Sequence, residues 1–346
     1  MLSTIRESYV LYRGVETRDN NEYLSNKKRN ELDLPILNAT DIERYSCEWG
    51  GLYVRFVPAE LKSNAEIKMY KVPQKVLLRR TGDKLISCVD EDGYLVTKNL
   101  YLLIPKTNLS AHFLCIILNS QLMNWERIRR MRDSGQAFAQ LKGTDITSFP
   151  IRRISFTTPA PERARLVAEL QQLYAEGKHD EILAGVESFL PKDESGNFIV
   201  EQEKSDVVHD LLAFLAERML EMNKQKQQEI RGFLDWLEGY LGAKIEDLKP
   251  KTKILSYYES DYESLLAVLK KNKKRLAVDP SRREPGEALR AEFEGSMSKL
   301  GPLRERIEET DELIDAVVYR LYGLTDEEIE IVEGREIDKE IESEEE

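Results

Sequence analysis

The segment KVLLRRTGDKLISCVDEDGYLVTKNLYLLIP, residues 75–105, alternates short apolar runs with turn-forming residues. The runs are rich in Val, Ile, Leu and Tyr, and they are Lys75–Arg80, Leu85–Val89 and Leu100–Ile104. Gly82 and Gly93, each beside an aspartate, lie between the runs and favour tight turns. We therefore predict short strands here, preceded by a further strand at Ile67–Tyr70.

A helix is predicted directly after these strands. Ser110 is a residue type that caps helix N-termini, and apolar side chains then recur at three- and four-residue spacing. These side chains are Phe113, Leu114, Ile117, Leu118 and Leu122. The helix runs toward Trp125 and an arginine cluster. The strands and the helix together predict a mixed, α+β module over residues 1–156.

The pattern becomes helical beyond residue 156. A stripe of apolar residues extends from Ser205 to Met222, and after a polar run at 223–229 it resumes and reaches Leu241. A continuous helix over 205–241 would be roughly 55 Å long at ~1.5 Å per residue. Separate helices are expected at 287–300 and 303–321. We predict a long-helix bundle for spacing or docking at residues 157–334 and an acidic, disordered tail at residues 335–346.

The charge of the chain changes at the same boundary. Residues 1–156 contain 24 Lys and Arg against 18 Asp and Glu, whereas residues 157–346 contain 27 against 45. The net charge of −12 and the pI near 5.1 therefore conceal a basic first module that could face a polyanion.

Several kinds of catalytic chemistry find no support in the sequence. No SPPY-like or NPPY-like tetrapeptide and no glycine-rich phosphate loop is present. The three histidines and three cysteines are far apart, without HExxH or CxxC spacing, so we expect neither a zinc site nor disulfides. No run approaches the ~20 apolar residues that span a bilayer, and no signal-peptide pattern is visible. We expect a cytoplasmic protein that does not interact with membranes.

One pattern loosely resembles a metal-dependent nuclease. Glu60, Glu66 and Lys68 lie close together in the sequence, and two carboxylates with a lysine could hold Mg²⁺ and a water molecule. The aspartate that such a pattern requires is missing, and the simpler interpretation is a solvated loop and strand. We expect no catalytic residue and no metal site on this chain, and keep the nuclease as an alternative.

Cationic and amide side chains of the first module suit DNA. Lysines bind phosphates as point charges, arginines can also read guanine edges, and asparagine or glutamine can read adenine. The predicted phosphate contacts are Lys27, Lys28, Lys84, Lys98 and Lys142. The predicted base or mixed contacts are Arg79, Arg80, Arg129 and Arg130, with Asn20, Asn21 and Gln136 as candidate adenine readers. The alternative is that these clusters are solvated faces.

The first module also contains an ordered series of segments with a family pattern. They are Arg13–Leu24, Leu34–Tyr45, Lys75–Leu85, Lys98–Pro105, Leu114–Trp125 and Gly135–Ile151. In the first segment, Gly14, Thr17 and Asn20 fall at the places of a G-x-x-T-G-x-N pattern, with Arg18 in place of its second glycine. Together these segments resemble the TaqI-like C-terminal specificity domain, the target recognition domain of type II (type IIG-like) restriction-modification enzymes.

The helical part is similar to the tail of large type II restriction-modification proteins in two segments, Ser205–Glu238 and Ile314–Gly334. The resemblance implies a domain that grips double-stranded DNA for an adenine-specific methyltransferase or endonuclease. The family's catalytic tetrapeptide and S-adenosylmethionine site have no counterpart in this sequence. The resemblance therefore implies that catalysis, with S-adenosylmethionine and Mg²⁺, resides on a partner chain. A helical adaptor that docks a partner is the remaining alternative.

Overall fold

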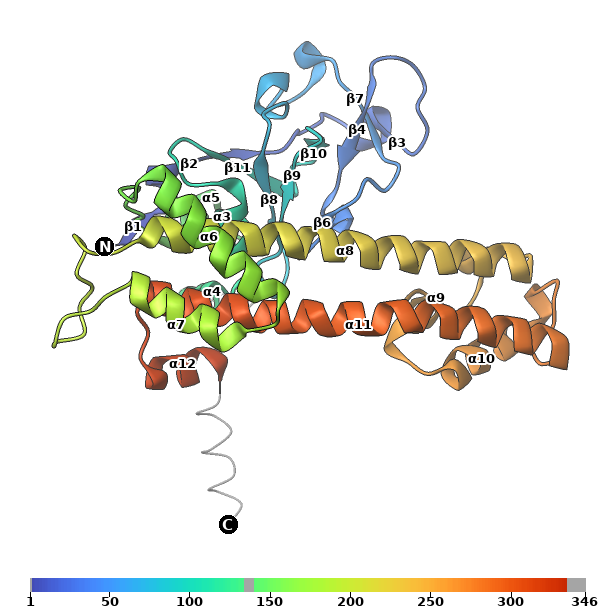
Figure 1. Ribbon diagram of the computed structural model, residues 1–346. Coiled ribbons are helices and arrows are strands. Elements are labelled where there is room, and N and C mark those ends of the chain that lie inside the picture. The colour runs from blue at the N-terminus through green and yellow to red at the C-terminus, as the bar shows by residue number, and fades with distance from the viewer. Residues whose placement is uncertain (1, 134–139, 335–346) are drawn as a thin grey trace. The chain divides into compact units, whose positions relative to one another are not determined.

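The computed structural model describes residues 2–133 and 140–334 of the 346-residue chain (Figure 1). It contains two compact units. Unit 1 comprises Met1–Leu220 together with Asp311–Glu346, and unit 2 comprises Glu221–Thr310. The sequence-based boundary at 156/157 follows the change in composition, whereas the chain passes from one compact unit to the other inside two long helices.

An antiparallel sheet of order β2-β11-β8-β9 lies at the centre of unit 1. Its strands are β2 (Tyr9–Arg13), β8 (Lys75–Arg79), β9 (Ser87–Asp90) and β11 (Leu100–Pro105). The last three confirm the strands predicted between residues 75 and 105. The strand predicted at Ile67–Tyr70 is wrong, because Ile67–Met69 forms a 3₁₀ turn. Only Tyr70 of that run is buried, while Ile67 is 41% exposed, so the run offers no apolar face to a sheet.

A second sheet of order β10-β4-β7-β3 packs against the first through a shared apolar core. Its strands are β3 (Leu24–Ser25), β4 (Asp33–Leu37), β7 (Tyr53–Arg55) and β10 (Leu95–Val96), and only the β10–β4 pair is parallel. Ile36 and Val54 of this sheet join Leu77 and Leu102 of the first in one cluster of buried side chains. Two short ribbons complete the strands, β1 (Leu2–Thr4) with β12 (Pro150–Arg152) and β5 (Ile42–Glu43) with β6 (Ser46–Cys47).

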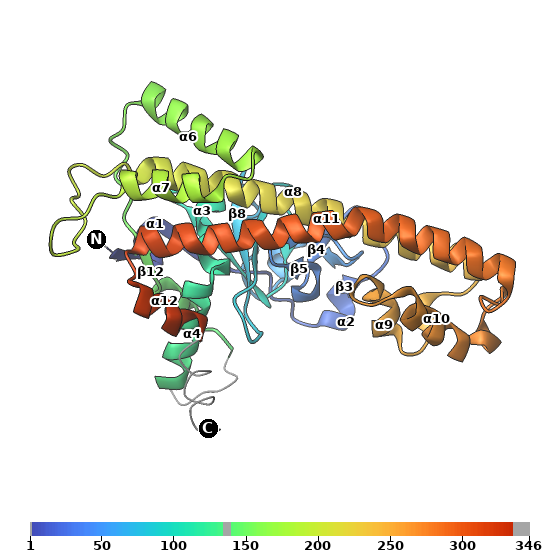
Figure 2. The same cartoon turned by 60° about the horizontal axis from the view of Figure 1, so that its bottom comes forward.

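The helix predicted after Ser110 forms, but it is broken in two. The Ser110 side chain accepts the Phe113 N–H at 2.9 Å, which confirms the predicted cap, and α3 (Ala111–Asn119) is buried throughout. Ser120 has extended backbone geometry, and its hydroxyl donates to the Ile117 carbonyl at 2.7 Å, so it ends the helix. A separate helix, α4 (Gln121–Asp133), then begins and extends away from the sheet (Figure 2).

The other helices of unit 1 come from both ends of the chain. They are α1 (Ile5–Ser8), α2 (Asn20–Tyr23), α5 (Gly143–Thr147), α6 (Ala160–Ala175), α7 (His179–Phe189), the first part of α8 (Ser205–Leu241), the last part of α11 (Arg283–Tyr322), and α12 (Asp326–Glu333). Helix α8 confirms the long helix predicted over 205–241. A buried ion pair, Arg152 to Glu203 at 2.5 Å, joins β12 to the segment that leads into α8.

The last part of α11 is held to the β5–β6 ribbon and to α4 by acidic side chains. Arg44 donates two 2.8 Å hydrogen bonds to the Asp311 carboxylate. Asp315 accepts the Gln121 N–H at 2.9 Å, at the N-terminus of α4. Burial raises the pKa of Asp315 to about 6, although the hydrogen bond from Gln121 opposes this rise. The C-terminal residues of α11 are thus part of the fold of the first module.

Unit 2 is helical. It contains α9 (Lys251–Leu255), α10 (Tyr262–Lys271) and the adjoining parts of α8 and α11 around one apolar core, with short 3₁₀ turns at Ile245–Asp247, Tyr257–Glu259 and Lys273–Arg275. The prediction of two helices at 287–300 and 303–321 is wrong, because α11 is continuous through Pro302. Proline removes the hydrogen bond to the Ser298 carbonyl, and both Pro302 and Ser298 are exposed to solvent.

The sheets of unit 1 and the long helices confirm the predicted α+β class. Two further 3₁₀ turns lie in unit 1, at Ala39–Asp41 and Pro58–Glu60. Among the described residues, no helix is long and apolar enough to cross a membrane.

A buried ion pair crosses the β8–β9 pairing. Lys75 and Asp90 are directly opposite each other, and both side chains are almost completely buried and in contact. The Lys75 amine also donates to the Tyr70 carbonyl at 2.7 Å. The Asp90 carboxylate accepts three backbone N–H groups of the following turn, from residues 92, 93 and 94. Each charge therefore has several partners inside the protein, which offsets the cost of burying it.

We expect Lys75→Met to lower the free energy of unfolding by about 3–5 kcal/mol, because it leaves the buried Asp90 carboxylate without its counter-charge. Urea unfolding followed by tryptophan fluorescence measures this loss. The double variant Lys75→Met/Asp90→Asn removes both charges and should lose less than the single variant. A cost below about 1 kcal/mol for Lys75→Met would contradict the role of the pair.

Candidate nucleic-acid interface

The turn between β8 and β9, residues 80–86 and here called the hairpin tip, is fastened to α4. Arg127 donates from its two Nη atoms to the carbonyl oxygens of Gly82 and Asp83. One turn earlier on α4, the Asn124 side chain accepts the Leu85 N–H at 2.7 Å. Burial lowers the pKa of Arg127, and the neighbouring Asp83 opposes this change. The hairpin tip is therefore a supported structure, and its exposed side chains start from fixed backbone positions.

Two of the predicted phosphate-binding lysines lie in or beside the hairpin tip. Lys84 is exposed in the hairpin tip, and its amine has no ion pair among the described residues. The Arg80 carbonyl accepts the Leu141 N–H at 3.0 Å, which brings Lys142 next to the tip. Lys142 is exposed, and its own N–H donates to Asp145 at 3.1 Å at the start of α5. Lys84 and Lys142, from distant parts of the sequence, thus lie on adjoining segments.

Lys98 reaches the same region through its backbone. Its carbonyl accepts hydrogen bonds from Arg80 at 2.7 Å and Arg13 at 3.2 Å. Its amine is 3.6 Å from the Glu16 carboxylate, which Lys62 also contacts at 3.1 Å. The hydrogen bond from Lys62 lowers the pKa of Glu16. The charge of Lys98 is therefore partly compensated, unlike that of Lys84.

The two arginines predicted to read bases at the end of β8 are half-buried and bonded to backbone carbonyls of the protein. Arg79 donates to the Ile42 carbonyl, and Arg80 donates to the Lys98 carbonyl while its guanidinium lies 5.2 Å from the Tyr101 ring centroid. The Nε atoms of both arginines are buried without a partner among the described residues. In this structure both guanidinium groups connect parts of unit 1.

The predicted arginines of α4 share one carboxylate. Arg129 contacts Glu126 at 2.8 Å and Arg130 contacts it at 2.5 Å, and Arg130 also donates to the Ser148 hydroxyl at 2.6 Å. Burial raises the pKa of Glu126, but the hydrogen bonds from the two arginines outweigh it and leave the pKa lowered. The side chain of Arg129 remains 48% exposed, so it is the more accessible of the two arginines.

Lys27 and Lys28 lie on the exposed loop between β3 and β4. The neighbouring Arg29 shapes this loop by a 3.1 Å ion pair with the buried Asp33, at the start of β4. The other end of β4 meets the β10–β11 turn, where Leu37 accepts a backbone hydrogen bond at 2.9 Å from the residue before Lys98. The two basic regions therefore adjoin opposite ends of β4, a strand of five residues that is ~16 Å long. The structure does not bring all the predicted lysines into one cluster.

The residues of the family pattern stabilise the loop after β2. A Cβ atom at Gly14 would lie 2.2 Å from the Thr97 carbonyl oxygen, so only glycine fits there. The Thr17 hydroxyl donates to the Asn20 side chain at 2.6 Å, which ties the loop to the start of α2. Arg18 occupies the place where the pattern has glycine, and its backbone is not in the left-handed conformation that would favour glycine. These contacts explain the pattern as backbone support.

The structure gives Glu60, one of the alternative nuclease residues, partners of its own. Glu60 accepts hydrogen bonds from Arg55 and from the Tyr23 hydroxyl, both at 3.3 Å, and it forms no hydrogen bond or ion pair with Lys68 in the described part of the chain. Within residues 2–133 and 140–334, no three or more His, Cys, Asp or Glu side chains form a group that could hold a metal ion. Of the candidate adenine readers, Asn20 and Asn21 are exposed, and Gln136 lies outside the described residues.

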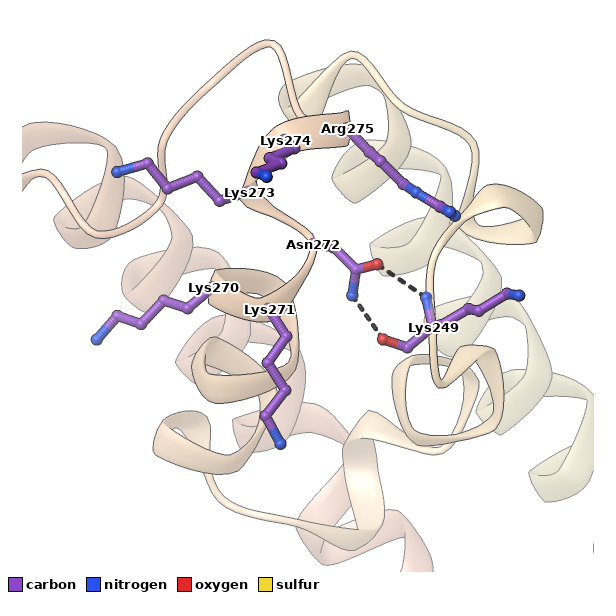
Figure 3. A pocket seen from close by; sticks show the side chains of 7 residues that line it. All are labelled: Lys249, Lys270, Lys271, Asn272, Lys273, Lys274 and Arg275. Carbon is purple, nitrogen blue, oxygen red and sulfur yellow. Dashed lines mark hydrogen bonds between the residues drawn. The ribbon is translucent and has the colours of Figure 1, made fainter.

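One basic feature was missed by the sequence reasoning, and it lies in unit 2. Lys249, Lys270, Lys271, Lys273, Lys274 and Arg275, here called the lysine cluster, surround Asn272 (Figure 3). In the sequence, the run KKNKKR at residues 270–275 indicates this cluster. The strongly negative total of residues 157–346 concealed that run.

Comparison with known families identifies two parts of the chain. Residues 34–151 match the TaqI-like C-terminal specificity domain, which confirms the resemblance for five of the six segments quoted above. The sixth, Arg13–Leu24, precedes the matched range. Residues 205–318 match a domain of unknown function (DUF8810). No curated protein matches the chain. The chain therefore contains a TaqI-like specificity domain, which supports DNA sequence specificity in a restriction-modification context.

We expect Arg79→Glu/Arg80→Glu to destabilise unit 1 by about 3–6 kcal/mol, because each substitution removes a charge-assisted hydrogen bond to a backbone carbonyl. Thermal unfolding followed by circular dichroism measures the effect.

Lys27→Glu/Lys28→Glu is the matched control, since it makes the same change in net charge on an exposed loop and should stay within about 0.5 kcal/mol of the wild type. Equal melting temperatures for all three proteins would show that the Arg79 and Arg80 side chains carry no structural role.

Proposed function

We propose that this chain is the sequence-specific double-stranded DNA recognition part of a restriction-modification system of type II. The observation that carries the proposal is the match of residues 34–151 to a specificity domain, because the match falls on the basic module of an otherwise acidic chain. The matched range also includes the hairpin tip with Lys84 and the adjoining Lys142.

In this proposal the lysines hold the phosphate backbone, while Arg79 and Arg80 shape the surface. Lys27, Lys28, Lys84 and Lys142 are exposed, and Lys98 is half-buried beside Glu16. Phosphate contacts set the position of a protein on the duplex without reading sequence. In this proposal the Lys27–Lys28 loop and the Lys98 region contact phosphates on both sides of one major groove, which is ~12 Å wide.

Base reading is assigned to an arginine of the helix that supports the hairpin tip. Arg129 is half-exposed on α4, whose residues Asn124 and Arg127 support the hairpin tip. Its partner Glu126 keeps a second cation, Arg130, when Arg129 turns toward DNA. Arg79 and Arg80 act as positioning residues in this proposal, because their guanidinium groups hold Ile42 and Lys98.

Catalysis is assigned to a partner chain. Target adenines are methylated outside the base stack, in a pocket of the catalytic domain, so recognition and chemistry can reside on different polypeptides. In this proposal the partner is an adenine-specific methyltransferase or an endonuclease in the cytoplasm. S-adenosylmethionine and Mg²⁺ would bind to that partner.

The proposal is tested by selecting duplexes from a randomised pool with the purified chain, alone and with a candidate methyltransferase. A single enriched sequence is expected, because base-edge contacts discriminate by about 1–3 kcal/mol per base pair. Recovery of an unenriched pool in both arms would contradict sequence-specific recognition.

We expect the variant with Lys27, Lys28, Lys84 and Lys142 all changed to Gln to bind selected and unrelated duplexes more weakly, by similar factors. The slope of log K against log salt should decrease in magnitude by up to about 3.6, at about 0.9 per phosphate contact. Fluorescence anisotropy at several salt concentrations measures both quantities. Changing Lys178, Lys192, Lys224 and Lys253 to Gln makes the same change in net charge and should preserve the slope. Equal slopes for both variants would remove these four lysines from the interface.

A further inference from the structure

The lysine cluster in unit 2 lines an open hollow of about 610 Å³. Its six cations are all exposed, and Asn272 is the one other lining residue. Figure 3 shows the charged side chains spreading outward around Asn272. The lining contains neither a carboxylate nor an apolar side chain. The charged groups that line the hollow are therefore all positive.

Asn272 fixes the geometry of this hollow. Its side-chain NH₂ group donates to the carbonyl oxygens of Lys249 and Val268 at 2.7 and 2.9 Å, and its side-chain oxygen accepts the Lys249 N–H at 2.9 Å. Asn272 itself is buried. These bonds hold the loop before α9 against the end of α10, which places Lys249 beside the run 270–275 (Figure 3).

Most of the charge in the lysine cluster is not compensated by the protein. Lys273 forms an ion pair with Asp279 at 2.8 Å, and Arg275 donates to the Asp247 backbone carbonyl, which leaves its charge in place. The amines of Lys270, Lys271 and Lys274 have no ion pair among the described residues.

The C-terminus of α10 favours nearby cations by about 0.3–1 kcal/mol each, which accounts for Lys270 and Lys271. It does not account for Lys274, which lies beyond the helix. The mutual repulsion of these amines is relieved when a polyanion binds.

We propose that the lysine cluster binds the phosphate backbone of duplex DNA outside the recognised sequence. This inference rests on the proposed function, and it adds a second, sequence-independent contact from a different unit of the chain. Five of the six cations are lysines, and lysine contacts phosphate as a point charge. Such contacts suit a backbone of repeating phosphodiesters.

The composition of the hollow favours DNA over an acidic protein. Protein–protein interfaces are depleted in lysine and centre on buried aromatic or apolar anchors, and the lining has none. Protein–DNA interfaces are more polar and far more positively charged.

The test compares the wild-type chain with the variant Lys270→Gln/Lys271→Gln/Lys274→Gln on two duplexes. One contains only the selected sequence, and the other extends it by 20 base pairs on each side, on the order of two helical turns. Each phosphate contact contributes about 5-fold to affinity at 0.15 M salt. The variant should bind the extended duplex about 30- to 200-fold more weakly than the wild type and the short duplex equally well. Its salt slope on the extended duplex should decrease in magnitude by about 1.8–2.7.

Changing Lys224, Lys226 and Lys253 to Gln gives the matched control in unit 2, which should retain wild-type binding to both duplexes. Identical binding of the extended duplex by the wild type and the cluster variant would overturn the inference. The inference would also be overturned if the cluster variant bound DNA like the wild type but lost binding to a polyglutamate peptide, since the cluster would then bind an acidic protein.

The proposed function and the inference about the lysine cluster can be contradicted independently of each other. If the wild-type chain enriches no sequence, the proposed function fails, while a random 60-base-pair duplex still tests the lysine cluster through the same variants. If the wild-type chain selects a sequence and the cluster variant behaves like it on both duplexes, only the further inference fails.

Discussion

The register between β8 and β9 is the constraint on which unit 1 depends. Lys75 and Asp90 are opposite each other in the central sheet, and both are buried with their charges in contact. A slip of one residue would turn every side chain of the strand to the other face and separate the two charges inside the core. Because the pairing is fixed at this end, the hairpin tip at the other end presents Lys84 to solvent and leaves the guanidinium of Arg79 inside the protein.

This arrangement divides the basic residues of the first module into two groups with different roles. The buried or half-buried arginines hold the surface together, since Arg127 supports the hairpin tip and Arg80 connects β8 to the β10–β11 turn. A guanidinium has five donors in a fixed geometry and can bridge several carbonyls, whereas the lysine ammonium is strongly hydrated and favours the surface. Exposed lysines such as Lys84 are thus the groups available to a polyanion.

The sequence was a good guide to the strands between residues 75 and 105, to the Ser110 cap and to the long helix at 205–241, because periodicity and capping act locally. It failed where the outcome depends on partners far away in the chain. The break at Ser120, and the use of Arg79 as an internal donor to Ile42, follow from tertiary contacts that no local pattern encodes. The lysine cluster was overlooked for another reason, since summed charge hides a local run such as residues 270–275.

Hydrogen exchange measures most directly where a duplex contacts the first module. Amides of the chain would be compared with and without the selected duplex. We expect slower exchange at residues 81–85 of the hairpin tip, at residues 142–145 and at residues 26–29, with no change at residues 58–68. Unchanged exchange at the hairpin tip, together with protection at residues 58–68, would contradict this expectation.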